Sequence, residues 1–384
     1  MAFINAVSFT IIIPVLYPYA KQFGLSDFEA SLLTTAYAAA QFIGTPILGR
    51  LSDRMGRKPL LIISLLGTVV ANLMASLAPF AWFLVIARVL DGVTGGNNSI
   101  AQAIISDITS PAQRTKAFGI FGATFRLGFV AGPQLSYLAQ LVPPLPGFSS
   151  LGMSFVVSAA IALIATVLCA IFLPETHQVC DKFELAWSDL KLGRILKSLR
   201  HPQLGRVFLL TFLSGFTFTI FTFAFQPFFL TVLGQTPGRL ALMFAMFGII
   251  GFMTQVFALE PLRKQFNIVT ILAFMLAARG ILFLLIPTFP TIGAFVLITI
   301  VFGAVNSFPL PLIESILSLR SGPQEQGEVL GTNASFLSLS NAIGPATAGL
   351  LVSFGYSFPF WVTGVLTVGV AGFALSLRQA EPTG

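Results

Sequence analysis

Charged residues are what this sequence has least of. Only 9% of its 384 residues are charged and 55% are hydrophobic, whereas a soluble domain carries about 25% charged residues. So few charges cannot cover a water-facing surface, so we expect an all-α integral membrane protein. The net charge of +7 would suggest acidic partners in a soluble protein. Here we attribute it to loops beside the membrane and expect no nucleic acid partner.

Cysteine and histidine are also scarce, with two of each. These numbers support neither a disulfide framework nor a metal site. The sequence contains no Gly-x-x-x-x-Gly-Lys-Ser/Thr segment that could cradle a nucleotide phosphate. We therefore expect no enzyme activity, no ATP-driven transport, no metal and no cofactor.

Long apolar runs take the place of these features. A membrane-spanning helix needs about 20 mostly apolar residues, and twelve segments meet that requirement. The predicted spans are 2–20, 28–48, 59–78, 81–106, 116–140, 152–173, 206–231, 239–259, 268–287, 290–316, 328–353 and 357–378. The first span has no positively charged start and is long enough to cross a membrane, so we expect a membrane helix and not a signal peptide.

The basic residues give this topology a direction. Most of the 21 lysines and arginines fall in segments that would be cytoplasmic, and the predicted outer loops contain only Lys21 and Arg239. This bias is typical of multi-pass proteins and predicts that both termini are cytoplasmic. The longest polar stretch, 174–205, would be a cytoplasmic linker between the halves 1–173 and 206–384.

The two halves share a pattern. Gly132-Pro133 recurs 212 residues later as Gly344-Pro345, and a further glycine precedes each pair at the same distance. Matched spacing in corresponding spans favours a duplication, with two pseudo-symmetric six-helix bundles packed around a site at the middle of the membrane.

The basic segment 49–58 reads GRLSDRMGRK. It resembles the loop between helices 2 and 3 of the major facilitator superfamily of secondary transporters, which implies the twelve-helix fold of that family. The resemblance also implies a cytoplasmic latch, in which Asp53 docks near the start of helix 11 and Arg54 joins a charge network. The predicted latch residues are Gly49, Asp53, Arg54, Gly56, Arg57 and Lys58. The alternative is that this loop only fixes topology through its positive charge.

Span 81–106 contains a polar stripe. Arg88 and Asp91 are three residues apart and so share one helix face, which Gly95, Ser99, Gln102 and Ser106 continue. Such a stripe should face the protein interior or a water-filled cavity. It resembles the family's helix 4 motif, which is linked to proton movement, and this predicts proton coupling through Asp91 and Arg88. A structural ion pair is the alternative.

Span 116–140 contains Gly128, Gly132 and Pro133. The glycines form a smooth strip for close helix packing, and the segment resembles the antiporter motif of efflux proteins. Ser136 and Tyr137 replace the closing glycines of that motif.

Arg126 stands beside this motif, where related sequences usually carry a small residue. It opens a second hypothesis, a carrier of a small anionic metabolite or sugar-like solute with Arg126 and Arg88 as ligands. A third hypothesis is a transporter-like receptor without transport. Asn5 hints at it, because tetracycline-efflux proteins, which the first span resembles, carry an acid there.

The leading prediction is a monomeric secondary transporter of a bacterial inner membrane, driven by a proton gradient. It would export small amphipathic, tetracycline-like compounds by alternating access, with protons, the small-molecule substrate and lipid as its partners. The polar residues predicted to line its cavity are Asn5, Tyr37, Gln41, Gln102, Arg126, Gln226, Asn306 and Asn333. Span 206–231 is also rich in phenylalanine, which could line the cavity or, more simply, fill helix contacts.

Overall fold

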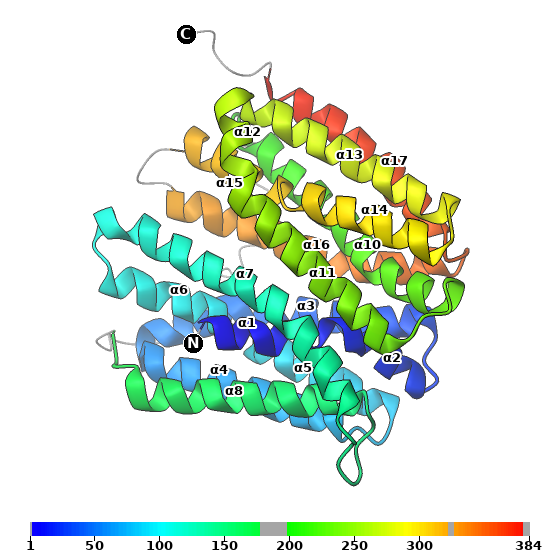
Figure 1. Cartoon of the computed structure of the whole chain (residues 1–384). Coiled ribbons are helices and arrows are strands. Elements are labelled where there is room, and N and C mark those ends of the chain that lie inside the picture. The colour runs from blue at the N-terminus through cyan, green and yellow to red at the C-terminus, as the bar shows by residue number, and fades with distance from the viewer. Residues whose placement is uncertain (1, 177–197, 322–325, 379–384) are drawn as a thin grey trace. The chain divides into compact units, whose positions relative to one another are not determined.

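The computed structural model describes residues 2–176, 198–321 and 326–378 (Figure 1). Regular structure in these residues is helical throughout. The chain divides into two compact units. Unit 1 comprises 1–190 and 236–245, and unit 2 comprises 191–235 and 246–384. Most of the predicted linker lies outside the described residues.

The helices follow the predicted spans closely. Unit 1 contains α1 (Ala2–Thr10), α2 (Ile13–Gln22), α3 (Asp27–Met55), α4 (Arg57–Ser76), α5 (Ala81–Thr94), α6 (Asn97–Ile108), α7 (Pro111–Leu141), α8 (Gly152–Phe172) and the start of α11 (Pro237–Phe257). Unit 2 contains α10 (Gly205–Pro227) with the π-helical turn η2 (Phe228–Val232), the rest of α11, α12 (Leu259–Gln265), α13 (Ile268–Thr288), α14 (Ile292–Asn306), α15 (Pro309–Arg320), α16 (Gln326–Val352) and α17 (Phe358–Leu375).

Within the described residues, nine helical segments are long and apolar enough to cross a membrane. The other three predicted spans correspond to α3, to α5 with α6, and to α7. These helices contain more polar residues or, between α5 and α6, a break.

Three spans that we predicted as continuous helices are interrupted well inside their bounds, and a fourth, 239–259, is broken near its end at Ala258. The first contains a turn between α1 and α2, and span 290–316 is broken at Ser307 and Phe308. In span 81–106, α5 ends at Thr94 and α6 begins at Asn97. Two consecutive glycines, Gly95 and Gly96, lie between the two helices. They explain the break, because glycine weakens a helix and permits a kink. The polar stripe therefore runs over two helices and not one.

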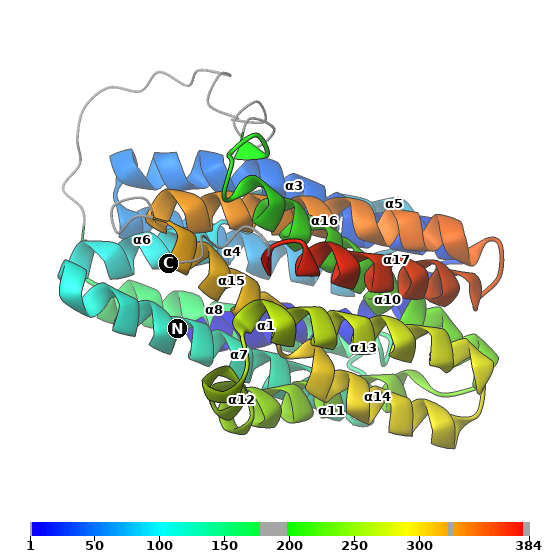
Figure 2. The ribbon, with the colours of Figure 1, turned by 90° about the horizontal axis from the view of Figure 1, so that it is seen from above.

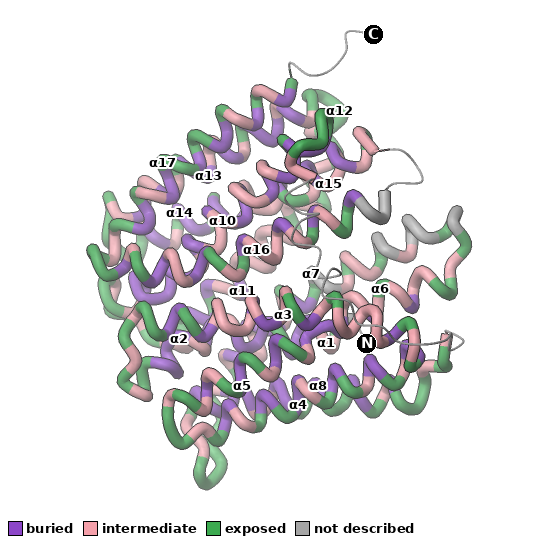
Figure 3. Tube along the Cα trace, turned by 180° about the vertical axis from the view of Figure 1, so that it is seen from behind, coloured by how far each residue is buried: buried purple, intermediate pink, exposed green. Residues whose placement is uncertain are grey.

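The helices pack in long pairs within each unit. In unit 1, α4 lies along α8, α3 along α5 and α1 along α7, and in unit 2, α13 lies along α17 and α10 along α16 (Figure 2). Buried positions alternate with exposed ones along these helices (Figure 3), as expected where one face packs against protein and the other faces lipid.

Phenylalanines fill the interior of unit 2. The ring of Phe221 on α10 lies 4.5 Å from that of Phe283 and 4.4 Å from that of Phe302, measured between centroids. Phe225 is fully buried and packs on Phe295 at 5.0 Å. These rings of span 206–231 therefore fill helix contacts within unit 2.

In unit 1, glycines bring α1 and α7 into close contact. The Thr10 hydroxyl donates a hydrogen bond of 2.8 Å to the Gly128 carbonyl. A Cβ atom on Gly132 would lie 2.8 Å from Thr10 Cβ and 2.9 Å from Ile11 N, which is closer than real side chains pack. A hydrogen in place of a side chain at these positions permits the contact.

Unit 2 repeats the same arrangement between α10 and α16. The Thr219 hydroxyl donates to the Ser340 carbonyl at 3.1 Å, and a Cβ atom on Gly344 would lie 2.8 Å from Thr219 Cβ. Ser340 and Gly344 stand 212 residues after Gly128 and Gly132. The sequence repeat is thus matched by the same threonine–carbonyl bond and the same glycine–threonine contact in each unit.

We predict that Gly132→Ala lowers the stability of the protein in detergent by about 1–3 kcal/mol, the usual cost of overpacking a close contact. The matched control is Gly122→Ala on the same helix, because nothing lies within 4 Å of a Cβ atom there. Thermal unfolding followed by fluorescence measures both variants. Equal unfolding temperatures would show that α1 and α7 separate without cost.

Candidate functional site

A buried ion pair lies inside unit 1. Arg88 Nη1 is 3.1 Å from Asp91 Oδ2, and the two side chains are 4% and 7% exposed. Both residues stand on α5, one helical turn apart, as the sequence predicts. A charge pair this deep must be well satisfied, because removing water from either group costs several kcal/mol.

Two further helices contribute to this pair. Arg88 Nη2 donates to Asn72 Oδ1 on α4 at 3.1 Å. The guanidinium carbon of Arg88 lies 5.6 Å from the ring centroid of Phe155 on α8, within the range of a cation–π contact. Arg88 therefore joins α4, α5 and α8, and Asn72 is a partner that sequence spacing did not reveal.

Tyr37 and Gln41 of α3 lie against the break after α5. Gln41 Nε2 donates to the Tyr37 hydroxyl at 3.0 Å and to the Gly95 carbonyl at 3.2 Å. The approach depends on Gly92, where a Cβ atom would lie 2.7 Å from Ala40 Cβ. Gln41 thus satisfies a carbonyl group that the helix break leaves free.

Asn5 belongs to a cluster of three asparagines. It accepts a hydrogen bond from Asn97 Nδ2 at 2.8 Å and donates to Asn98 Oδ1 at 3.2 Å. Uncharged amides therefore link α1 to the start of α6. Gln102 lies further along α6 with an exposed side chain, and the side chain of Arg126 lies outside the described residues.

The cavity residues predicted in the second half lie in unit 2. Asn333 Oδ1 accepts from the Thr211 hydroxyl at 2.6 Å. Gln226 is buried, and its Oε1 has no partner among the described residues. Asn306 Oδ1 accepts from Arg279 Nη1 at 3.3 Å. The predicted set is therefore divided between the two units.

Arg279 on α13 is a second buried arginine that the sequence did not mark as a site. It is 2% exposed, and its Nη2 donates to the Ser214 carbonyl and hydroxyl and to the Thr217 hydroxyl at 3.0–3.1 Å. Among the described residues its partners are all uncharged. The signal available in the sequence was a lone arginine within an apolar span, since such a group must find acceptors inside the protein.

We expected segment 49–58 to be a loop from Gly49 onward, and this prediction is wrong. The segment is largely helical. Helix α3 continues to Met55, and Gly49 lies inside it with its carbonyl accepting from the Ser52 hydroxyl at 2.6 Å. The turn is made by Gly56 alone, whose φ of +96° favours glycine. An i,i+4 ion pair between Asp53 and Arg57 spans this turn.

Arg57 is the most buried charge of this segment. Its Nε donates to Asp107 Oδ2 at 3.0 Å and its Nη1 to the Ser52 hydroxyl at 2.8 Å. Arg57 therefore joins α3 and α4 to the end of α6. The docking of Asp53 near the start of helix 11 and the charge network of Arg54 stay predictions.

Glu175 caps the start of α4. Its carboxylate accepts from the backbone N–H groups of Arg57 at 2.9 Å and Lys58 at 3.1 Å. A helix N-terminus attracts negative charge and has unsatisfied N–H groups, so one carboxylate serves both needs. Glu175 is more than 100 residues away in sequence, so no local spacing connects it with the start of α4.

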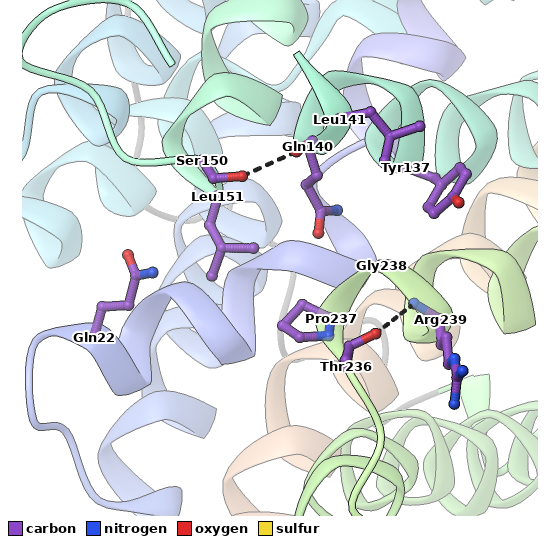
Figure 4. Close-up of a pocket in the computed structure, with 10 residues that line it drawn as sticks. All are labelled: Gln22, Tyr137, Gln140, Leu141, Ser150, Leu151, Thr236, Pro237, Gly238 and Arg239. Atoms are coloured by element: carbon purple, nitrogen blue, oxygen red, sulfur yellow. Dashed lines mark hydrogen bonds between the residues drawn. The ribbon is translucent and has the colours of Figure 1, made fainter. Parts of the chain in front are cut away.

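A surface pocket in unit 1 contains none of the predicted cavity residues. It is lined by Gln22, Tyr137, Gln140, Leu141, Ser150, Leu151, Thr236, Pro237, Gly238 and Arg239 (Figure 4). Ser150 donates to the Gln140 carbonyl at its edge. Its lining includes neither Arg88 nor Asp91, and we assign it no role in transport. Within the described residues, no group of three or more His, Cys, Asp or Glu side chains could hold a metal ion.

Known proteins resemble this chain over most of its length. The family model of the Major Facilitator Superfamily matches residues 1–258 and 207–384. Multidrug resistance protein 1 of Bacillus subtilis (strain 168) is 28% identical over 372 residues, which cover 96% of this chain and 92% of that protein. Tetracycline resistance protein, class C, of Escherichia coli is 29% identical over 361 residues, covering 89% and 85%.

Solved structures show the same fold. A bacterial homolog of the human lysosomal transporter Spinster, inward-facing and occupied, has a TM-score of 0.76 at 16% identity and covers 99% of this chain and 95% of that one. The human organic anion transporter MFSD10 has a TM-score of 0.73 at 20% identity, covering 97% and 96%. At these identities the likeness concerns the fold alone.

We predict that Glu175→Ala destabilises the protein by about 1 kcal/mol, the usual cost of losing a helix cap. Glu175→Gln keeps one acceptor oxygen and should lose less. Thermal unfolding in detergent ranks the three proteins. If both variants unfold at the wild-type temperature, the cap does not contribute to the stability of α4.

Proposed function

The chain belongs to the major facilitator superfamily, and on that basis we propose that it exports small amphipathic compounds in exchange for protons. Its relatives named above are multidrug and tetracycline resistance proteins, which supports drug export over the uptake of a nutrient. We propose that the two halves, 1–173 and 206–384, rock against each other around a central substrate site.

The observation that carries this proposal is the buried Arg88–Asp91 pair. An ionised Asp91 neutralises Arg88, and a protonated Asp91 leaves the guanidinium without a counter-ion. The two states therefore favour different packing around α5. A proton that binds from one side of the membrane and leaves on the other can then drive the change between conformations.

We assign other parts of the chain to the conformational cycle. Asp53, Arg54 and Arg57 would hold the cytoplasmic side closed, and Lys58 would add to the positive charge there. Gly128, Gly132 and Pro133 would form the interface along which α7 moves on α1. Contacts of the glycines with α1 support this role, because bulkier residues there would resist sliding.

The substrate would contact polar side chains of both halves. The proposed residues of the first half are Asn5, Tyr37, Gln41, Gln102 and Arg126. Those of the second half are Gln226, Asn306 and Asn333. We also propose that the protein works as a monomer in a bacterial inner membrane, with both termini cytoplasmic and the proton gradient as its energy source.

Asp91→Asn tests the coupling. Proteoliposomes with an imposed pH gradient are incubated with a fluorescent tetracycline. We expect liposomes that contain the wild-type protein to accumulate it. Asp91→Asn removes the titratable group while keeping the size of the side chain, so accumulation should fall to the level of protein-free liposomes. The control is Glu260→Gln, an exposed acid on α12, which should transport like the wild type.

Undiminished gradient-driven accumulation by Asp91→Asn would contradict proton coupling at this residue. Wild-type protein that moves neither tetracycline nor any other small amphipathic compound under any gradient would contradict drug export itself.

A further inference from the structure

Arg88 has a second acceptor whose role the proposed function leaves open. We propose that Asn72 is a positioning residue that holds Arg88 when Asp91 is neutral, and thereby sets the pH at which Asp91 exchanges its proton. This inference rests on the proposed function, in which Asp91 carries the coupling proton.

The geometry of Asn72 supports this role. It stands on α4 with a fully buried side chain, and its Oδ1 accepts from Arg88 Nη2 at 3.1 Å while Asp91 takes Nη1. Its Nδ2 has no partner among the described residues. A buried amide that leaves a donor unsatisfied is costly. Its one hydrogen bond goes to a guanidinium that would lose its counter-ion each time Asp91 is protonated.

Unit 2 contains the same assembly without an acid. Arg279 donates to Asn306 Oδ1 at 3.3 Å, and its guanidinium carbon lies 6.0 Å from the ring centroid of Phe283. Arg88 likewise combines an asparagine at 3.1 Å with a phenylalanine ring at 5.6 Å. The Nε atoms of Arg88 and of Arg279 both have no hydrogen-bond partner among the described residues. Among the described residues, asparagine and other neutral groups therefore hold the buried guanidinium of Arg279 with no carboxylate beside it.

The two assemblies exchange their positions in the repeat. In unit 1 the arginine is on α5 and the asparagine on α4, whereas in unit 2 the arginine is on α13 and the asparagine on α14. Spans 59–78 and 268–287 hold corresponding places in the two halves. The first contains the asparagine and the second contains the arginine, so the two residue types have exchanged helices. The arginine–asparagine contact is present in both units although the acid is present in one.

Few other groups act on Asp91. Arg88 is the charged neighbour on α5. From α3 the titratable group near the carboxylate is Tyr37, and from α4 the nearby side chains are Thr68 and Asn72, neither of which titrates. From α8, Phe155 covers the guanidinium. Asn72 is thus a neutral acceptor on Arg88 that remains when the carboxylate is protonated.

The sign of the effect follows from this arrangement. The bond from Arg88 to Asn72 matters most when Asp91 is neutral, because the carboxylate no longer compensates the guanidinium charge. Removing the amide destabilises the protonated state more than the ionised state. Asp91 then binds its proton less tightly, and the midpoint of its titration moves to lower pH. A second carboxylate at position 72 has the opposite effect, since it adds negative charge beside Asp91.

The experiment follows the titration directly by infrared spectroscopy of the protein reconstituted in liposomes. The C=O stretch of a protonated carboxylic acid reports each buried acid, and its loss in Asp91→Asn identifies the Asp91 band. We expect Asn72→Leu to weaken proton binding at Asp91 by about tenfold or more, the low end for a hydrogen bond to a charged group. Asn72→Asp should shift the titration to higher pH.

The matched control is Asn306→Leu, which removes the equivalent amide from Arg279 and should leave the Asp91 titration unchanged. Opposite shifts in the two Asn72 variants cannot come from a shared folding defect. If neither variant moves the Asp91 midpoint, or if Asn306→Leu moves it equally, Asn72 does not set the protonation of Asp91. If the band assigned to Asp91 never titrates in the wild type, the coupling role of Asp91 fails as well, and the absence of a titration distinguishes that failure from an unshifted one.

Discussion

A guanidinium buried among apolar helices must have acceptors, and this requirement organises the interior of each unit. An arginine cannot lose its proton at any pH that the protein meets, so it cannot escape the cost of burial by becoming neutral. Arg88 meets the requirement with a carboxylate, an amide and an aromatic ring. Arg279 meets it with a carbonyl, two hydroxyls and an amide. In each case the acceptors come from neighbouring helices, so one charge fixes the packing of several helices.

Close backbone approach is the second constraint. Thr10 and Thr219 can reach the carbonyls of the facing helix only because Gly132 and Gly344 carry no side chain there. Since helices in a membrane gain little from hydrophobic burial against each other, such close contacts and interhelical hydrogen bonds supply much of their association. The same contact in both units explains why the Gly-Pro pattern of the sequence repeats at a constant spacing.

Features that depend on local spacing could be predicted from the sequence. The helical spans follow from apolar run length, and the Arg88–Asp91 pair follows from residues three apart on one helix. The break at Gly95 and Gly96 was visible in the sequence, but the length of the apolar run outweighed it. Glu175 and Asn72 could not be predicted, because their partners lie on other helices and no periodicity connects them. The continuation of α3 through Gly49 was missed because a glycine among charges is typical of a turn, whereas here α3 continues to Met55 and the Asp53–Arg57 ion pair connects it to the start of α4 across Gly56.

The difference between the two arginine assemblies has a consequence for coupling. In the proposed mechanism a proton changes the state of unit 1, where an acid faces the guanidinium. The neutral acceptors of Arg279 do not titrate between about pH 4 and 9. In a duplicated transporter one proton-sensitive half is sufficient, since a ligand shifts a conformational equilibrium by its differential affinity for the two states. In the proposed mechanism Asp91 would be the single coupling site of the duplicated fold, and Asn72 would hold Arg88 while Asp91 is protonated.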